Sequence, residues 1–306
     1  MHDERTRIER LAGAASSGVA GRPKLGAGEL RAFASDAKIA VLATVSPGSM
    51  PHLTLLTSLQ GKDANTLTFG QFTEGTSKDN LRLRPEAAFA ILTTDGRVWH
   101  GTARWRGRST SGADYDAYNR KPLFRYNASS GIHTVHYLDL IGIVGPSKPS
   151  KVKILTNHLV TLFAASRAAL RESRPILSPW SRRLLSGSAT MKFFAYVRED
   201  GYPELRALIP CIDADGSLLV FPAASLGRSV VAENKPIAVF AINLQLNSVL
   251  LRGRFLGCRR YLGRQTGVIE VDWVYNSMPP KQGQIYPLTP LHGLTPKPAC
   301  ESGRIG

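Results

Sequence analysis

The sequence predicts a mainly β protein: two β-barrels in tandem, each with peripheral helices, packed together as a pseudo-dimer within one chain of 306 residues. Two observations predict this fold class. A set of landmarks recurs at one constant offset, and each copy consists of short apolar stretches separated by turn signals. Helical patterns do not alternate with the strands, so a barrel is favoured over a parallel doubly wound sheet. A second copy would cover the apolar flank that a small barrel leaves open.

The repeat rests on four pairs of landmarks, which are prolines, a phenylalanine and a glycine. Three pairs lie 152 positions apart and the fourth lies 151 apart: Pro51 with Pro203, Phe69 with Phe221, Gly101 with Gly253, and Pro85 with Pro236. Four landmarks that keep one offset to within a residue indicate a duplicated domain.

Within each copy the predicted strands follow in the same order. Residues 39–59 and 192–212 each contain a strand, a turn with Gly48 or Gly201, a proline and a second, alternating strand. The later strands are predicted over 67–72, 84–91 and 100–105 in the first copy, and over 218–223, 235–242, 252–257 and 267–275 in the second.

Helices are predicted before and between the barrels. A short helix precedes each barrel, over 29–35 and 181–185. Residues 151–171 carry apolar side chains at helical spacing, typical of an amphipathic helix, which Pro175 and Pro179 then end; these positions are Ile154, Leu155, His158, Leu159, Leu162 and Phe163. We therefore expect an N-terminal barrel domain over 1–150, a linker helix over 151–177, and a C-terminal barrel domain with an extended tail over 178–306.

The first copy carries an additional segment, residues 109–134, which is rich in Tyr, Asn, Ser and Gly. The second copy has no counterpart. A segment of this length beside a barrel is a lid, a dimer flap or a plain surface excursion, and the sequence leaves these alternatives open.

The formal charge of +16 favours phosphate-bearing ligands, nucleic acid or an anionic surface as partners. The basic residues are scattered, however. The densest stretch lies between the copies and favours a solvated helical face over a specific anion surface; it comprises Lys151, Lys153, Arg167, Arg171, Arg174, Arg182 and Arg183.

Three cysteines, Cys211, Cys258 and Cys300, are too few and too scattered for a disulfide framework or a structural zinc site. The opening MHDERTRIER has no apolar core behind it, which argues against a secretory signal, and no apolar run is long enough to span a membrane. The expectation is a cytoplasmic protein without a membrane partner.

The run FGQFTEGTSKDNLRLRPEAAFAILTTDGRVWHGTARW, residues 69–105, resembles the core signature of the pyridoxamine 5'-phosphate oxidase-like FMN-binding split-barrel family. That signature has a strand, a Ser/Thr-Lys/Arg turn, an Asn-Leu-Arg helix, a proline, an apolar strand, and a strand ending in Gly-x-Ala. The resemblance covers residues 27–147 and, more loosely, 178–290. It implies two split barrels with FMN bound at their interface.

FMN presents a phosphate dianion and a flat, largely apolar ring, so its site needs cationic and hydroxyl donors at one end. A turn that delivers hydroxyls and backbone amides into a helix start suits the phosphate. Thr76, Ser77 and Lys78, followed by Asn80, fit this description. The alternative is an ordinary solvent-exposed helix cap.

The second copy carries different donors at the matching positions. In the family that this chain resembles, an arginine on the second strand often contacts the phosphate, and Arg206 occupies that place, where the first copy has Thr54. Two further candidates match the turn of the first copy: Arg228 opposite Ser77, and Ser229 opposite Lys78. Either both copies bind flavin with different donors, or one binds it and the other is scaffold.

Other candidates are weaker. His133 and His136 lack a third and fourth ligand, so no metal site is predicted. Trp99 favours a core position over a ring-stacking one. No Walker loop, dinucleotide-binding glycine pattern or nucleophile elbow is present.

The leading hypothesis is an FMN-dependent oxidoreductase of unknown small-molecule substrate, with FMN not distinguished from a deazaflavin or haem. The C-terminal arginine-histidine-arginine pattern that grips the substrate in the oxidase proper has no match in IYPLTPLHGLTPKP, which argues against pyridoxamine phosphate. One alternative is a non-catalytic flavin- or haem-binding module. A nucleic-acid-binding protein is less favoured, because the charge is scattered and no aromatic-basic motif is present. Catalytic residues and further dimerisation are left open.

Overall fold

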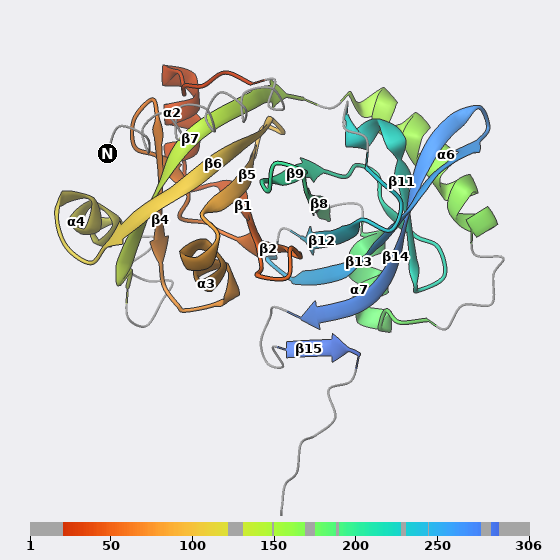
Figure 1. Ribbon diagram of the computed structural model, residues 1–306. Coiled ribbons are helices and arrows are strands. Elements are labelled where there is room, and N and C mark those ends of the chain that lie inside the picture. Colours follow the sequence, from red (N-terminus) through yellow and green to blue (C-terminus); the bar gives the residue numbers. More distant parts are fainter. Residues whose placement is uncertain are drawn as a thin grey trace, which may run out of the picture.

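Two antiparallel sheets, one from each half of the chain, make up the computed structural model (Figure 1). The structure describes residues 21–121, 131–148, 150–168, 175–187, 190–227, 231–243, 245–276 and 283–287. The prediction of a mainly β protein with two barrels and peripheral helices is confirmed. No helix in these ranges is both long enough and apolar enough to cross a membrane.

The first sheet has the strand order β2-β1-β5-β6-β7-β4-β3. Its end strands, β2 and β3, do not pair with each other, so the barrel is split. Its strands are β1 (Lys38–Val45), β2 (Pro51–Leu55), β3 (Gln60–Gly61), β4 (Thr66–Gln71), β5 (Glu86–Thr93), β6 (Val98–Ser109) and β7 (Thr134–Ser147), and its helices are α2 (Ala27–Ala34), α3 (Thr76–Leu83) and α4 (Ala113–Arg120).

The second sheet, read from its other end, has the order β9-β8-β12-β13-β14-β11-β10, which repeats the first sheet strand for strand. A short strand, β15 (Gly283–Tyr286), adds to β14. The strands are β8 (Met191–Val197), β9 (Pro203–Ala207), β10 (Ile212–Asp213), β11 (Leu218–Pro222), β12 (Pro236–Ile242), β13 (Ser248–Tyr261) and β14 (Arg264–Asn276); the helices are α6 (Lys151–Ala168), α7 (Pro179–Ser186) and the 3₁₀ turn η1 (Ala223–Leu226).

The landmark pairs fall on equivalent strands. Pro51 and Pro203 each begin an edge strand, where a missing backbone donor costs little. Gly101 in β6 and Gly253 in β13 each lie where a paired strand approaches so closely that a Cβ would collide with a backbone carbonyl, of Gly142 or of Glu270. Each glycine lies beside a register shift of its strand pair.

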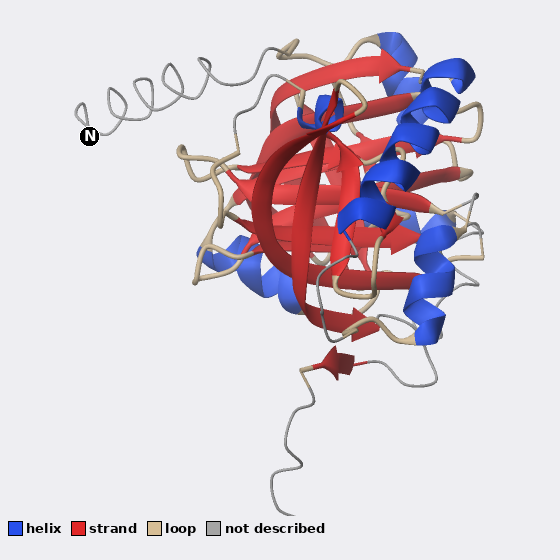
Figure 2. Cartoon of the chain, turned by 90° about the vertical axis from the view of Figure 1, so that its right-hand side faces the viewer, coloured by secondary structure: helices blue, strands red, loops and turns tan. Residues whose placement is uncertain are grey.

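Each sheet curls around its own apolar core (Figure 2). Alternate residues of β1 show how: Leu42 lies in the core of the first barrel, whereas Val41 faces a third core that is shared with the second half. In β12, Val239 and Phe240 divide in the same way. These strands therefore read as continuous apolar runs because both of their faces are buried.

The shared core is the seam, formed by Val41, Ala43, Leu53, Ala88, Ala90, Phe193, Ala195, Leu205, Ala238, Phe240, Ile242 and Leu250. Contacts across it are reciprocal: β2 packs on β12 and β8, and β9 packs on β5 and β1, which are the equivalent strands of the other half. Reciprocal contact of this kind is the geometry of an isologous interface.

Helix α6 is present as predicted, but the expected apolar face is not the one that packs. Leu155, Leu159 and Leu162 are 61%, 59% and 51% exposed. The buried face is made of Ala164, Ala165 and Ala168, which pack against β11 and β14. Small side chains let the helix axis approach the sheet closely, so the larger leucines point away. The helix ends at Ala168, and residues 169–174 lie outside the described ranges.

The additional segment of the first half packs on its own barrel. Helix α4 buries Tyr118, whose hydroxyl donates to the backbone oxygen of Ser58 and lies 3.0 Å from the Thr68 hydroxyl. The second half replaces this excursion by a tight hairpin turn at Leu262 and Gly263. Of the alternatives, the described part of the segment fits a surface excursion; residues 122–130 are not described.

Candidate functional site at the seam

Helix α3 brings a buried cation to the first half of the seam. The helix begins after Gly75, and Thr76 at its first position is exposed, whereas Ser77 and Lys78 are buried. Neither hydroxyl caps the helix, so the simple helix-cap alternative does not apply. Burial lowers the pKa of Lys78, with Glu74 and Asp79 acting in the opposite direction. No carboxylate among the described residues forms an ion pair with its ammonium group.

His52 lies on β2, a strand that contacts both α3 and the second half of the chain. Its Nδ1 is 3.3 Å from Nη2 of Arg252 on β13, and its Nε2 is 3.1 Å from Oγ1 of Thr54. A guanidinium only donates, so Nδ1 accepts and Nε2 carries the proton. Burial, reinforced by Arg252 and Lys78, lowers the pKa of His52 to about 4. The imidazole is therefore neutral at pH 7.

Arg252 is the second cation of this cluster. Its guanidinium lies over the ring of Trp273 at 4.4 Å from the centroid, and Trp273 is stacked on Tyr275 at 5.6 Å with an interplanar angle of 6°. Its Nε is buried without a hydrogen-bond partner among the described residues, and the charge of Asp272 acts to raise its pKa against the effect of burial. The cluster of Lys78, His52, Thr54, Arg252 and Trp273, here the first seam site, thus joins two cations, a neutral imidazole and an aromatic stack.

The equivalent place in the other half, the second seam site, carries a different charge balance. Arg206 on β9 lies against Gly227, the repeat partner of Gly75, but it is paired at 2.8 Å with Glu204. His100 on β6, the repeat partner of Arg252, has its Nε2 buried without a partner. Burial, with help from Arg206, lowers the pKa of His100 to about 4. Among the described residues, the arginine of this site is thus paired with a carboxylate, whereas the two cations of the first site are not.

Apart from Thr76 and Ser77, whose places on α3 are given above, the sequence-predicted residues divide into four groups. Thr54 contacts His52, and Lys78 lies on α3, which packs on the strand of His52, and its charge helps to lower the pKa of that histidine. Asn80 has a structural contact, because its amide donates a buried hydrogen bond to the Thr44 hydroxyl on β1 at 3.0 Å. Arg206 belongs to the second seam site, while Arg228 and Ser229 lie outside the described residues.

Sequence reasoning missed His52, Arg252 and Trp273. A usable signal existed for two of them. Arg252 and His100 are repeat partners beside the landmark glycines, and His52 directly follows the landmark proline Pro51. His100 and Arg252 each directly follow apolar residues near the start of their strand, and His52 directly precedes Leu53. Trp273 gave no such signal, because a tryptophan in a strand is typical of a core.

The two histidines considered as metal ligands make other contacts. The Nδ1 atom of His133 is 3.0 Å from the hydroxyl of Thr134. His136 is stacked on Phe69 at 4.5 Å, accepts from Trp105 at Nδ1 and donates to Gln71 at Nε2. Within the described ranges no three of the residue types His, Cys, Asp and Glu come together. Trp99 is a core residue as predicted, edge-on to Phe33 at 5.5 Å.

Comparison with known proteins gives weak likenesses only. No family model matches the chain, and no curated protein matches it. Among solved structures, an FMN-binding protein from Syntrophomonas wolfei is 13% identical, with 49% of this chain and 100% of that chain covered and a TM-score of 0.33. HupZ from Group A Streptococcus is 15% identical, with coverages of 41% and 99% and a TM-score of 0.34. An F420 reductase is 17% identical, with coverages of 39% and 98% and a TM-score of 0.32. The chain's own contacts are therefore the basis for assigning a function.

Proposed function

We propose that this chain binds FMN at the first seam site and is an FMN-dependent oxidoreductase whose two halves act as the subunits of a dimer. One observation carries the proposal: His52 is 3.3 Å from Arg252 of the other half and its pKa is also lowered by the charge of Lys78, and neither cation forms an ion pair with a described carboxylate. Two such cations suit a phosphate dianion, since charge-assisted hydrogen bonds are the stronger ones. The landmark residues and the shared strand order support a duplicated domain.

The residues present fit the two parts of FMN. Lys78 and Arg252 would hold the phosphate, and the Thr54 hydroxyl, which accepts from His52, still has its own proton to donate. The neutral imidazole adds no charge that would repel or compete. The stacked Trp273 and Tyr275 offer an apolar face beside Arg252. FMN would supply the electron chemistry, and the protein would bind and orient it.

Charge selects the first seam site over the second. Glu204 neutralises Arg206 in the second site, whereas the repeat partner of Glu204 in the first site is the neutral His52. Counting the described residues, a dianion therefore meets two cations without an ion pair in one site and an arginine–carboxylate pair in the other. We infer one working site, with the second serving as scaffold.

The test compares FMN with riboflavin, which has the same ring and no phosphate. Binding to the full chain is followed by quenching of flavin fluorescence. Wild type should bind FMN more tightly than riboflavin, and Lys78→Met or Arg252→Met should each weaken FMN binding about 10- to 100-fold, because each removes a charge-assisted contact. Riboflavin affinity should stay unchanged in Lys78→Met.

Arg206→Met is the matched control, because it removes a cation from the second seam site and should leave FMN affinity unaltered. Equal binding of FMN and riboflavin by wild type would refute a phosphate site. An FMN loss in Arg206→Met as large as that in Lys78→Met would refute the choice of half. Turnover is tested separately, by anaerobic bleaching of the bound flavin with NADH or NADPH; a bound flavin that neither reduces would favour the non-catalytic module.

A further inference from the structure

A cavity of about 1050 Å³ opens in the second half, away from the seam. It lies between α6, α7 and the segment 208–213, and its volume is at the upper end of the range for small-molecule sites. Leu185, Leu208 and Cys211 form part of its lining and belong to the core of the second barrel. The cavity therefore reaches the core at the open end of this barrel. Exposed leucines of α6, Leu155 and Leu162, form part of its wall.

Lys192 lines this cavity where the barrel core begins. Its side chain follows the same face of β8 as Phe194 and Tyr196, which lie inside the barrel, and the residue is 9% exposed. Its repeat partner in the first half is Ala40, a fully buried core residue. An alanine fills this place at no electrostatic cost, whereas a lysine there must have its ammonium group desolvated or bound.

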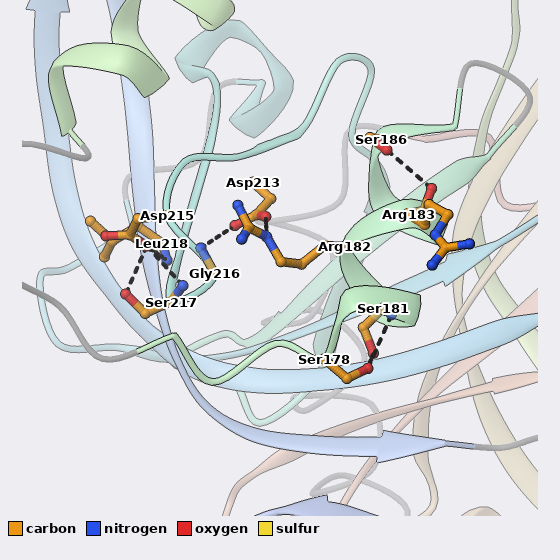
Figure 3. Close-up of polar contacts among 10 residues, drawn as sticks. All are labelled: Ser178, Ser181, Arg182, Arg183, Ser186, Asp213, Asp215, Gly216, Ser217 and Leu218. Atoms are coloured by element: carbon orange, nitrogen blue, oxygen red, sulfur yellow. Dashed lines mark hydrogen bonds and ion pairs between the residues drawn. The ribbon is translucent and has the colours of Figure 1, made fainter.

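No described carboxylate neutralises this lysine. Asp213, the acid that lines the cavity, is paired at 2.6 Å with Arg182 (Figure 3). Cys211 is fully buried, and burial raises the pKa of its thiol to about 12, so it carries no negative charge at pH 7. Burial lowers the pKa of Lys192 itself. The cavity thus holds an uncompensated cation in apolar surroundings.

A second cation stands at the rim. Arg183 on α7 is exposed, and its guanidinium makes none of the contacts drawn among its neighbours in Figure 3, since Ser186 bonds only to its backbone oxygen. Lys192 and Arg183 make no ion pair with a described carboxylate, and the rest of the wall is mainly apolar, with His158, Thr190 and the Arg182–Asp213 pair among its polar members. This combination complements a ligand with an anionic head and an aliphatic body. A flat phosphate ester such as FMN does not match these walls.

We propose that this cavity binds a carboxylic acid with an aliphatic chain, its carboxylate on Lys192 and its chain along Leu185, Leu208 and the leucines of α6. The site is independent of the seam sites and of their cofactor. Binding would satisfy the lysine and cover apolar surface that is otherwise exposed to water.

The experiment measures binding of dodecanoate to the full-length protein by calorimetry, with dodecanol as the uncharged analogue. Wild type should bind dodecanoate at least tenfold more tightly than dodecanol. Lys192→Met, which keeps the length of the side chain and removes its charge, should weaken dodecanoate binding about tenfold or more and leave dodecanol binding unchanged or tighter. Leu155→Glu, an exposed rim substitution, should weaken dodecanoate binding without disturbing the fold.

Lys38→Met is the matched control, because Lys38 begins the equivalent strand of the first half and should not affect binding. The proposal is overturned if wild type binds no dodecanoate, if it binds dodecanol equally well, or if Lys192→Met keeps the wild-type affinity for dodecanoate. Circular dichroism of each variant verifies folding, which for Lys192→Met should be at least as stable as wild type.

Discussion

Three histidines of this chain are held neutral by burial: His52 and His100 at the seam, and His136 against Phe69. For each, burial is the main cause that lowers the pKa to about 4, and neighbouring cations add to it. An unfolded histidine has a pKa of about 6.5. Between these values the unfolded chain binds more protons than the folded chain. The free energy of unfolding therefore falls as the pH is lowered from 6.5 towards 4.

His136→Gln tests this pH dependence. Each histidine lowers the stability by up to about 2 kcal/mol at pH 5, and glutamine does not titrate there. Chemical denaturation gives the unfolding free energy at pH 7 and at pH 5. The loss of unfolding free energy between the two pH values should be smaller in the variant than in wild type, by about this amount. His158→Gln, at an exposed position of α6, should keep the wild-type difference. An unaltered difference in His136→Gln would show that this histidine is not held neutral.

At the level of elements, α6 shows how side-chain size decides which face of a helix packs. Its alanines lie against Leu218, Val220 and Val268 on the outer face of the second sheet. Its leucines are exposed and border the cavity of Lys192. A stripe of leucines is expected to be the buried one from hydropathy alone, but small facing residues let the helix lie closer to the sheet.

Substitutions on the two faces of α6 should separate clearly. Ala164→Leu places a larger side chain where the helix contacts the sheet and should lower the free energy of unfolding by about 1–3 kcal/mol. Leu159→Lys lies on the exposed face and should change it by less than about 0.5 kcal/mol. Urea denaturation of both variants measures this. If Leu159→Lys proved the more damaging, the leucine stripe would be the packed face after all.

The two halves of the molecule are held together by the shared core, to which both contribute residues. Phe240 of β12 is 2% exposed in this shared core, whereas Phe255 of β13 lies within the second barrel alone. If one half unfolded alone, the apolar surface that the other half contributes to the shared core would be exposed to water. The two halves should therefore depend on each other for stability.

Phe240→Ala should destabilise both halves, by about 3–5 kcal/mol, because it leaves a cavity between them. Hydrogen exchange measured by mass spectrometry should show faster exchange in β1 and β5 of the first half as well as in β8 and β12. Phe255→Ala makes the same change in the core of the second barrel alone. It should speed exchange in the second half more than in the first. Faster exchange confined to the second half in both variants would mean that the halves unfold independently.

Much of this architecture was determined by the sequence alone. The offset of 152 between Pro51 and Pro203, the alternating strands and the short helices predict two barrels of one kind, because local geometry and burial leave their mark in residue order. Thr54 and Lys78 were also identified by pattern; Thr54 contacts His52, and the charge of Lys78 helps to lower the pKa of that histidine.

The tertiary structure alone decided which charges meet. Arg252 and His52 are 200 positions apart in the chain and come together only because β2 packs across the seam on the second half. Within the second half, tertiary packing likewise brings α6 and α7 together beside Lys192 to form its cavity. Electrostatic balance depends on distance and desolvation in three dimensions, and neither is encoded in the spacing of residues along one strand.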